Sequence, residues 1–163
     1  MAWSQENNIR FDRNLNSFYI LLQSDSSINL FPQNSVFNFR SKLNKQYNLN
    51  DDWVVALCDL ELYLSDTYLS ENNLYIFCDI IAETQVGNTD EQMLRRVPIR
   101  KSDVSQDWLK TNFQTLYYIP LKTTTLTEIG IRIEQSAQTL AARKDKPTSL
   151  LLHFKKLYNG SQQ

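Results

Sequence analysis

Two acidic residues, one histidine and two cysteines are the side chains of this chain that are best suited to chemistry. Asp59 and Glu61 alternate along one apolar segment, so in a strand their carboxyl groups would share a face, about 6.5–7 Å apart. That separation falls within the range of paired carboxylates in glycosidases. Acidic residues at i and i+2 are, however, common on the solvated face of a strand, so we assign no active site to this pair.

His153 is the single histidine, which removes most schemes in which a base activates a nucleophile. It alternates with Leu152 and Phe154, so we expect its ring to point outward from a strand, at the surface or at an interface. The chain contains 3 glycines, and none belongs to a loop that could cradle a phosphate. The sequence therefore predicts no catalytic residue and no cofactor, and we expect the protein not to be an enzyme.

Cys58 and Cys78 each lie in an apolar segment. A disulfide and a reactive thiol are the functional alternatives, but free cysteine is among the most buried residue types, which favours two reduced core thiols. No CxxC spacing is present, and one histidine with two isolated cysteines does not complete a zinc site. We therefore expect no bound metal.

Length and charge are those of an ordinary globular protein. The 163 residues suit one domain, and the formal net charge is −1. Such a charge provides no overall basic field for nucleic acid or an acidic membrane. Residues 1–16 lack the apolar core of a secretory signal, and no run approaches a membrane span. We therefore expect a soluble protein that is not secreted.

One short basic segment is the remaining candidate for nucleic-acid binding. Its basic residues are Arg95, Arg96, Arg100 and Lys101. Tyr117 and Tyr118 supply aromatic rings elsewhere, and basic sheets with aromatic residues can bind single strands. The segment is short, however, and three acidic residues lie between positions 83 and 91. We expect a charged rim that pairs with a neighbouring acidic surface, and no specific nucleic-acid partner.

Eight short apolar segments must position these side chains. They are residues 17–23, 36–43, 53–64, 73–81, 93–99, 115–121, 128–134 and 149–157. None is followed by an amphipathic stretch long enough for a crossover helix, which indicates an antiparallel sandwich or barrel. Eight is also the strand number of the jelly roll. We expect an all-β fold, an eight-stranded antiparallel single jelly-roll sandwich.

The connections predict loops and one or two short helical turns. Segments 24–35, 44–52 and 136–149 are polar and are predicted as loops. A helical turn begun at Ser65 or Asp66 is predicted in 64–72. A second is predicted in 102–113, where Val104, Trp108 and Leu109 recur at helical spacing behind a serine cap.

The alternation of side chains sorts the strands into two kinds. Segments 36–43, 128–134 and 149–157 have one apolar and one polar face. Segments 53–64 and 73–81 are apolar on both faces. In the first of these, the residues expected to face inward are Val54, Ala56, Cys58, Leu60 and Leu62. A strand of this kind is covered either by its own chain or by a neighbouring subunit, and both alternatives remain open here.

The residue pattern of these segments is also informative. FYILLQSDSSINLFPQNSVFNFRSKLNKQYNLNDDWVVALCDLEL contains an aromatic strand, a serine turn, Pro-x-Asn, a Phe-containing strand and Leu-x-x-x-Trp-x-Val-Ala-Leu. LYIFCDIIAETQVGNTDEQMLRRVPI, LYYIPL, IGIRIE and LLLHF follow in order. From Ser17 to Leu157 the chain resembles the minor capsid, or penton, proteins of Polinton/Maverick-type elements and the related adintovirus-like viruses of animals.

The resemblance implies a single jelly roll that forms homopentamers at the vertices of an icosahedral capsid and contacts a larger major capsid protein. It places the chain in the virion, after synthesis as a soluble intracellular protein, and implies no catalytic residue. The positions that match the family motifs are Pro32, Asn34, Trp53, Ala56, Leu57, Val86 and Gly87. They are expected to serve folding: Pro32 restrains a turn, and Gly87 supplies a positive φ or a close approach.

The expected organisation is a polar N-terminal arm (1–16), one jelly-roll domain (17–158) and a C-terminal tail (159–163). Trp3, Ile9 and Phe11 are isolated apolar anchors in the arm, which we expect to extend beneath neighbouring shell proteins. Two alternative functions stay open. One is another virion assembly protein, such as a single-jelly-roll major capsid or cement subunit, and the other is a non-viral ligand-binding β-sandwich.

Overall fold

The computed structural model describes residues 9–11, 16–23, 36–50, 52–63, 72–100, 104–105, 108–135 and 148–157, and within these ranges every regular element is a strand. In chain order the strands are β1 (Ile9–Phe11), β2 (Ser17–Gln23), β3 (Val36–Asn48), β4 (Trp53–Tyr63), β5 (Asn72–Cys78), β6 (Thr84–Val86), β7 (Thr89–Glu91), β8 (Met93–Ile99), β9 (Val104–Ser105), β10 (Trp108–Asn112), β11 (Ile119–Pro120), β12 (Thr125–Gln135) and β13 (Ser149–Lys156).

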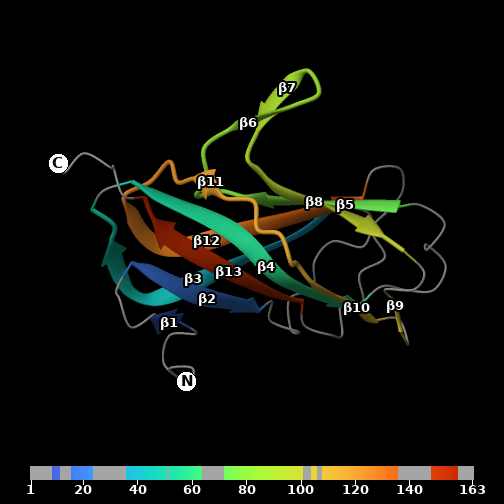
Figure 1. The fold of residues 1–163 in the computed structure, drawn as a ribbon, viewed down its shortest axis with the longest axis horizontal. Helices are drawn as coiled ribbons and strands as arrows, with labels where there is room; N and C mark the ends of the chain where they lie inside the picture. The colour runs from blue at the N-terminus through green and yellow to red at the C-terminus, as the bar shows by residue number, and fades with distance from the viewer. Residues whose placement is uncertain are drawn as a thin grey trace.

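Two antiparallel sheets form a sandwich (Figure 1). The larger sheet has the strand order β1-β2-β13-β4-β10-β9, and β11 also pairs with β4. The smaller sheet has the order β3-β12-β5-β8. β6 and β7 form a separate hairpin, which projects from the sandwich at the top of Figure 1. The predicted all-β antiparallel sandwich is therefore confirmed.

The core lies between the two sheets and collects the apolar side chains that alternate along their strands. Ile129 and Ile133 of β12 are completely buried, as the alternation predicts. Leu150, Leu152 and Phe154 of β13 enter the core from the opposite sheet and are also 0% exposed. Each such side chain contributes about 1.5–3 kcal/mol of burial free energy, so the alternation determines which face of each sheet packs inward.

Most of the predicted strands are present. Segments 17–23 and 93–99 coincide with β2 and β8, and five others overlap β3, β4, β5, β12 and β13. β3 continues through residues 44–48, where a loop was expected, because its ladder with β12 resumes at Tyr47 and Asn48 after a register shift beyond Lys42. Segment 115–121 is wrong as a full strand. Only Ile119 and Pro120 of this segment pair with β4, and residues 115–118 lie outside the ladder.

The helix predicted over 102–113 is wrong, because this segment forms β9 and β10. Leu109 lies opposite Leu62 of β4 and is fully buried in the core. Its neighbour Trp108 packs edge-on against Tyr63, with ring centroids 3.7 Å apart. Pairing with β4 outweighs the helical spacing of a few apolar residues. The loop at 24–35 and the tail at 159–163 lie outside the described residues. So do residues 64–71 of the other predicted turn (64–72) and residues 136–147 of the predicted loop 136–149, whereas Asn72 begins β5 and Ser149 begins β13.

The inward face predicted for β4 is only half right. The residues of β4 that contribute to the core are Val55, Leu57, Leu60 and Leu62. The register with β13 shifts at Cys58, which is an extra residue between Leu57 and Asp59. A bulge of this kind interrupts the period of two, so the inward positions change from odd to even numbers along the strand. Val54, Ala56 and Cys58 consequently lie on the outer face, although they were expected to point inward.

Part of the predicted N-terminal arm is paired with the sandwich. Ile9–Phe11 forms β1, which adds to the edge of the larger sheet beside β2. The Ile9 side chain is 2% exposed and belongs to the core. Trp3, the first of the expected anchors, lies outside the described residues.

Candidate interaction site

A groove of about 690 Å³ lies on the outer face of the smaller sheet, beside the β6–β7 hairpin. Strands β3, β5 and β12 supply its floor, and the hairpin and its base supply one wall. The residues that line it are Asn38, Phe39, Arg40, Phe77, Cys78, Asp79, Glu83, Asp90, Glu91, Gln92, Gly130, Ile131 and Arg132. Several of these side chains form one connected polar network.

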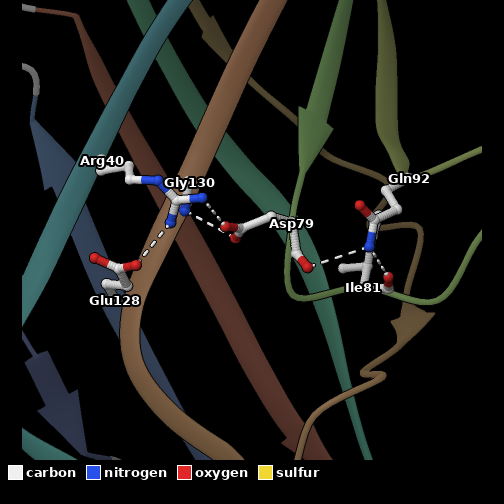
Figure 2. Close-up of polar contacts among 6 residues, drawn as sticks. All are labelled: Arg40, Asp79, Ile81, Gln92, Glu128 and Gly130. Carbon is white, nitrogen blue, oxygen red and sulfur yellow. Dashed lines mark hydrogen bonds and ion pairs between the residues drawn. The ribbon is translucent and has the colours of Figure 1, made fainter.

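Asp79, directly after β5, is the centre of that network (Figure 2). Its Oδ1 accepts a hydrogen bond from the backbone N–H of Gly130 at 2.8 Å, and its Oδ2 lies 2.9 Å from Arg40 Nη2. The Asp79 backbone N–H donates to the Gly130 carbonyl at 3.1 Å. Arg40 Nη1 also reaches Glu128 Oε1 at 3.0 Å. These contacts tie β3, β12 and the end of β5 together across the outer face.

Gly130 stands where the network crosses β12, opposite Arg40 in register. A Cβ at this position would lie 2.7 Å from Asp79 Oδ2 and 3.2 Å from Arg40 Cζ, too close for the present arrangement. The missing side chain therefore lets the Arg40–Asp79 ion pair close directly over the backbone of β12. Gly130 lies on the polar face predicted for segment 128–134, and the sequence assigned it no role. The available signal was a glycine inside an otherwise regular strand, which often marks a close approach.

The hairpin is held at its base and at its tip. Gln92 Nε2 donates to the carbonyl oxygens of Asp79 at 3.1 Å and of Ile81 at 2.9 Å, as Figure 2 shows. Thr84 Oγ1 donates to the carbonyl of Glu91 at 3.2 Å, between the two strands. At the tip, Gly87 has a φ of +62°, which is the first of the two alternatives that the sequence offered for this glycine. Two-residue hairpin turns require this conformation at their first central position.

Arg132 connects the hairpin to β12. Its Nη2 lies 3.1 Å from Glu91 Oε2, and its Nη1 lies 3.2 Å from Glu134 Oε1. Its guanidinium carbon is 4.1 Å from the centroid of the Phe77 ring, a cation–π arrangement. Phe77 is 6% exposed within the single chain. This part of the second apolar face of β5 is therefore covered by the protein's own side chains.

Negative charge exceeds positive charge in the groove. Two arginines line it together with four carboxylates: Asp79, Glu83, Asp90 and Glu91. Both arginines, Arg40 and Arg132, already form ion pairs. Glu83 and Asp90 are exposed, and neither has an ion-pair partner among the residues that the structure describes. The rim of the groove thus presents carboxylates that remain available to a cation.

The sequence predicted His153 at the surface or at an interface, and within the single chain its side chain is buried. Its ring points away from the core, as the alternation requires, but it is 9% exposed. Tyr118 Oη lies 2.7 Å from His153 Nδ1, and the ring of Tyr19 stacks on the imidazole with centroids 4.4 Å apart. Val54 and Ala56, on the same outer face, are buried as well. Because this burial occurs within one chain, the second apolar face of β4 is covered by its own chain.

Both cysteines are free and buried, as predicted. Burial raises the pKa of Cys78 to about 12. Burial, together with the nearby charge of Asp59, raises the pKa of Cys58 to about 11. The thiolate, which is the reactive form, is therefore scarce at neutral pH. Within the described residues, no group of three or more His, Cys, Asp or Glu side chains is placed to hold a metal ion.

The two carboxylates singled out on β4 have separate structural contacts. Asp59 accepts a hydrogen bond from Asn112 Nδ2, and Glu61 Oε1 lies 3.1 Å from Lys110 Nζ. Asn112 and Lys110 lie directly opposite these acids on β10. Cross-strand pairs of this kind stabilise a sheet, and each of the two carboxylates takes part in one.

In the described part of the basic segment, Arg96 and Arg100 are exposed, whereas Arg95 is held by its own chain. Arg95 stacks on Phe113 and Tyr117, with its guanidinium carbon 3.8 Å and 4.6 Å from their ring centroids. Arg96 is exposed, whereas Arg95 is half-buried, and Lys101 lies outside the described residues. The charge of Arg95 is therefore engaged with aromatic rings of the same chain.

The positions that carry the family resemblance lie in separate places. Trp53, Ala56 and Leu57 belong to β4, Val86 and Gly87 lie at the hairpin tip, and Pro32 and Asn34 are outside the described residues. Trp53 Nε1 donates to the Asn50 carbonyl at 3.1 Å, and its ring lies 5.3 Å from that of Phe18. Among the described positions of this set, Val86 and Gly87 belong to the hairpin beside the groove.

No protein-family model and no curated protein matches the sequence. Among solved structures, a chain from the structure of infectious bursal disease virus Gt strain is similar to this chain at 9% identity, with a TM-score of 0.25. The match covers 96% of this chain and 39% of that chain, so this chain spans about two fifths of its length. A likeness at this level carries no argument about function. In the part of the chain that the structure describes, no helix is long and apolar enough to cross a membrane.

Proposed function

We propose that this chain is a viral structural protein, a single-jelly-roll penton subunit that forms homopentamers at the vertices of an icosahedral capsid. The proposal places it in the virion, in contact with a major capsid protein, and assigns it no catalytic role. Its support comes from the order in which the strands pair and from the family resemblance of the sequence.

The strand pairing is the observation that carries the proposal. The strands of five or more residues are, in chain order, β2, β3, β4, β5, β8, β10, β12 and β13. The first pairs with the last, the second with the seventh, the third with the sixth and the fourth with the fifth. These four ladders describe one long antiparallel ribbon. Rolling the ribbon places the eighth strand beside the third and the seventh beside the fourth, and both pairings are present as β13·β4 and β12·β5.

A ribbon rolled in this way supports a jelly roll of eight strands, with β1, β6, β7, β9 and β11 as additions to it. Jelly rolls occur in viral capsid proteins, lectins and cupins, so the fold alone does not decide among these functions. The resemblance of residues 17–157 to penton proteins favours the capsid role. Subunits that contact one another through two different surfaces around an axis close into a ring, which is the assembly a vertex requires.

Native mass spectrometry of the purified chain tests the proposal. We expect a species of five subunits, and ring-shaped particles of the same mass by electron microscopy. A chain that stays monomeric at high concentration would contradict any shell role and favour a ligand-binding sandwich. The number of copies in a purified particle then separates the remaining classes, because a penton occupies only the vertices whereas a major shell or cement subunit is present in many more copies.

A further inference from the structure

β3 is an edge strand with an excess of positive charge. Of the described strands only β12 pairs with it, so its other side presents backbone N–H and C=O groups along a strand of 13 residues. The strand contains Arg40, Lys42 and Lys45 and no acidic residue. Arg40 is held by carboxylates of its own chain. Lys42 and Lys45 are exposed, and neither forms an ion pair within the described part of the chain.

The β6–β7 hairpin has the opposite charge. Residues 82–92 contain Glu83, Asp90 and Glu91 and no basic residue. Glu91 forms an ion pair with Arg132. Glu83 and Asp90 are exposed, and neither forms an ion pair with a described residue. The hydrogen bonds of Gln92 and the ion pair of Arg132 brace the hairpin where it leaves the sandwich. Its position is set before any partner binds, which lowers the entropic cost of docking.

We infer that the hairpin of one subunit docks along the free edge of β3 in the next subunit, where Glu83 and Asp90 face Lys42 and Lys45. The inference rests on the proposed self-assembly and names the surfaces that would form it. The opposite charges of the two surfaces make them complementary, although the chain as a whole carries a net charge of only −1. Because the surfaces are different patches of one chain, the contact is heterologous and each subunit has one donor and one acceptor side. It also covers a long strand edge, which otherwise invites non-specific pairing.

Charge reversal at each surface tests the inference. The Lys42→Glu/Lys45→Glu variant and the Glu83→Lys/Asp90→Lys variant each place like charges across the contact. We expect each to weaken association by about tenfold or more in sedimentation and native mass spectrometry. The four substitutions combined restore opposite charges with their positions exchanged, so association should recover. The wild-type contact should also weaken as salt is raised.

Two matched controls separate this contact from a general effect of charge. Lys122→Glu and Asp52→Lys each reverse a single charge of the same kind at exposed positions outside β3 and the hairpin, and should leave association unchanged. Circular dichroism and urea unfolding verify that every variant is folded.

The outcomes distinguish this inference from the proposed function. Oligomers that form equally well in both reversed variants would overturn the inference and leave the proposed function standing, with its interface elsewhere. Loss of association that the combined variant does not recover would also overturn it. A monomeric wild-type chain would instead refute the proposed function, and the inference with it.

Discussion

The Gly130→Ala substitution probes the network that organises the floor of the groove. The new methyl group would lie 2.7 Å from Asp79 Oδ2, and that oxygen cannot retreat freely because the carboxylate is held by the Gly130 N–H and by Arg40. The backbone of Gly130 lies outside the left-handed region, so alanine is compatible with it. The effect of the substitution therefore comes from the displaced carboxylate.

The expected change in unfolding free energy is the difference between the interactions that are lost and the backbone stabilisation that alanine gains. Losing the charge-assisted hydrogen bond from Gly130 to Asp79 costs about 1.5–3 kcal/mol. The Arg40–Asp79 ion pair adds only about 0–1 kcal/mol because its side chains are 55% and 34% exposed. Alanine in a strand regains about 0.5–1 kcal/mol relative to glycine. The net loss is about 0.5–3.5 kcal/mol, or a Tm lower by roughly 1–14 °C for a domain of this size.

Urea unfolding of a double-mutant cycle with Asp79→Ala provides the assay. Without the carboxylate, the remaining close neighbour of alanine at position 130 is the end of the flexible Arg40 side chain, at 3.2 Å. The substitution should then be neutral or stabilising by about 0.4–1 kcal/mol. The interaction between the two positions is then the quantity that the cycle measures. Equal destabilisation in both backgrounds, or a Gly130→Ala protein as stable as the wild type, would refute the reasoning.

Three further predictions concern other parts of the molecule. Tyr118→Phe removes the hydrogen bond to the buried His153 and should cost about 1–3 kcal/mol in urea unfolding, whereas Tyr117→Phe, at a residue 60% exposed, should change stability by less than about 0.5 kcal/mol. Gly87→Val places a side chain at a φ of +62° and should cost about 1–2 kcal/mol, visible as a lower Tm, while Gly87→Asn should cost less. The raised pKa values of Cys58 (about 11) and Cys78 (about 12), against the ordinary 9.0, make the unfolded chain release its thiol protons first, so the unfolding free energy should fall as the pH rises from 9 toward 12.

Each of these predictions has a clear contrary result. If the Tyr118 and Tyr117 variants lost the same unfolding free energy, the hydrogen bond to His153 would not be the cause of the loss. A Gly87→Val protein with an unchanged Tm would show that the hairpin tip contributes nothing to stability. For the thiols, an unfolding free energy that stays constant above pH 9, or rapid labelling of either cysteine in the folded protein, would contradict their burial.

Much of the fold could be predicted because its information is local. The alternation of Ile129, Ile131 and Ile133 identifies the inner face of β12, and the same period identifies β13. The positive φ of Gly87 was one of the two alternatives that the sequence offered for this glycine. Period-two patterns and turn residues are properties of a few consecutive residues, so they can be recognised before the chain is folded.

The remaining features depend on partners distant in sequence. Leu109 and Trp108 form a strand because β4 is available to pair with them, although their spacing suggested a helix. Cys58 becomes a bulge because of the register that β13 adopts on β4, and this shift exchanges the two faces of the strand. His153 is buried because Tyr118, 35 positions away, lies over it. None of these contacts produces a periodic pattern in the local sequence.

The candidate groove depends almost wholly on contacts between residues that are distant in sequence. Sequence alone determined that the protein is an antiparallel β-sandwich and which faces of several strands carry charge. Only the tertiary structure decided that Arg40, Asp79 and Gly130 meet across three strands, and that the hairpin stands beside them. The physical reason is that alternation assigns a side chain to a face, whereas strand order and register determine which side chains become neighbours on that face.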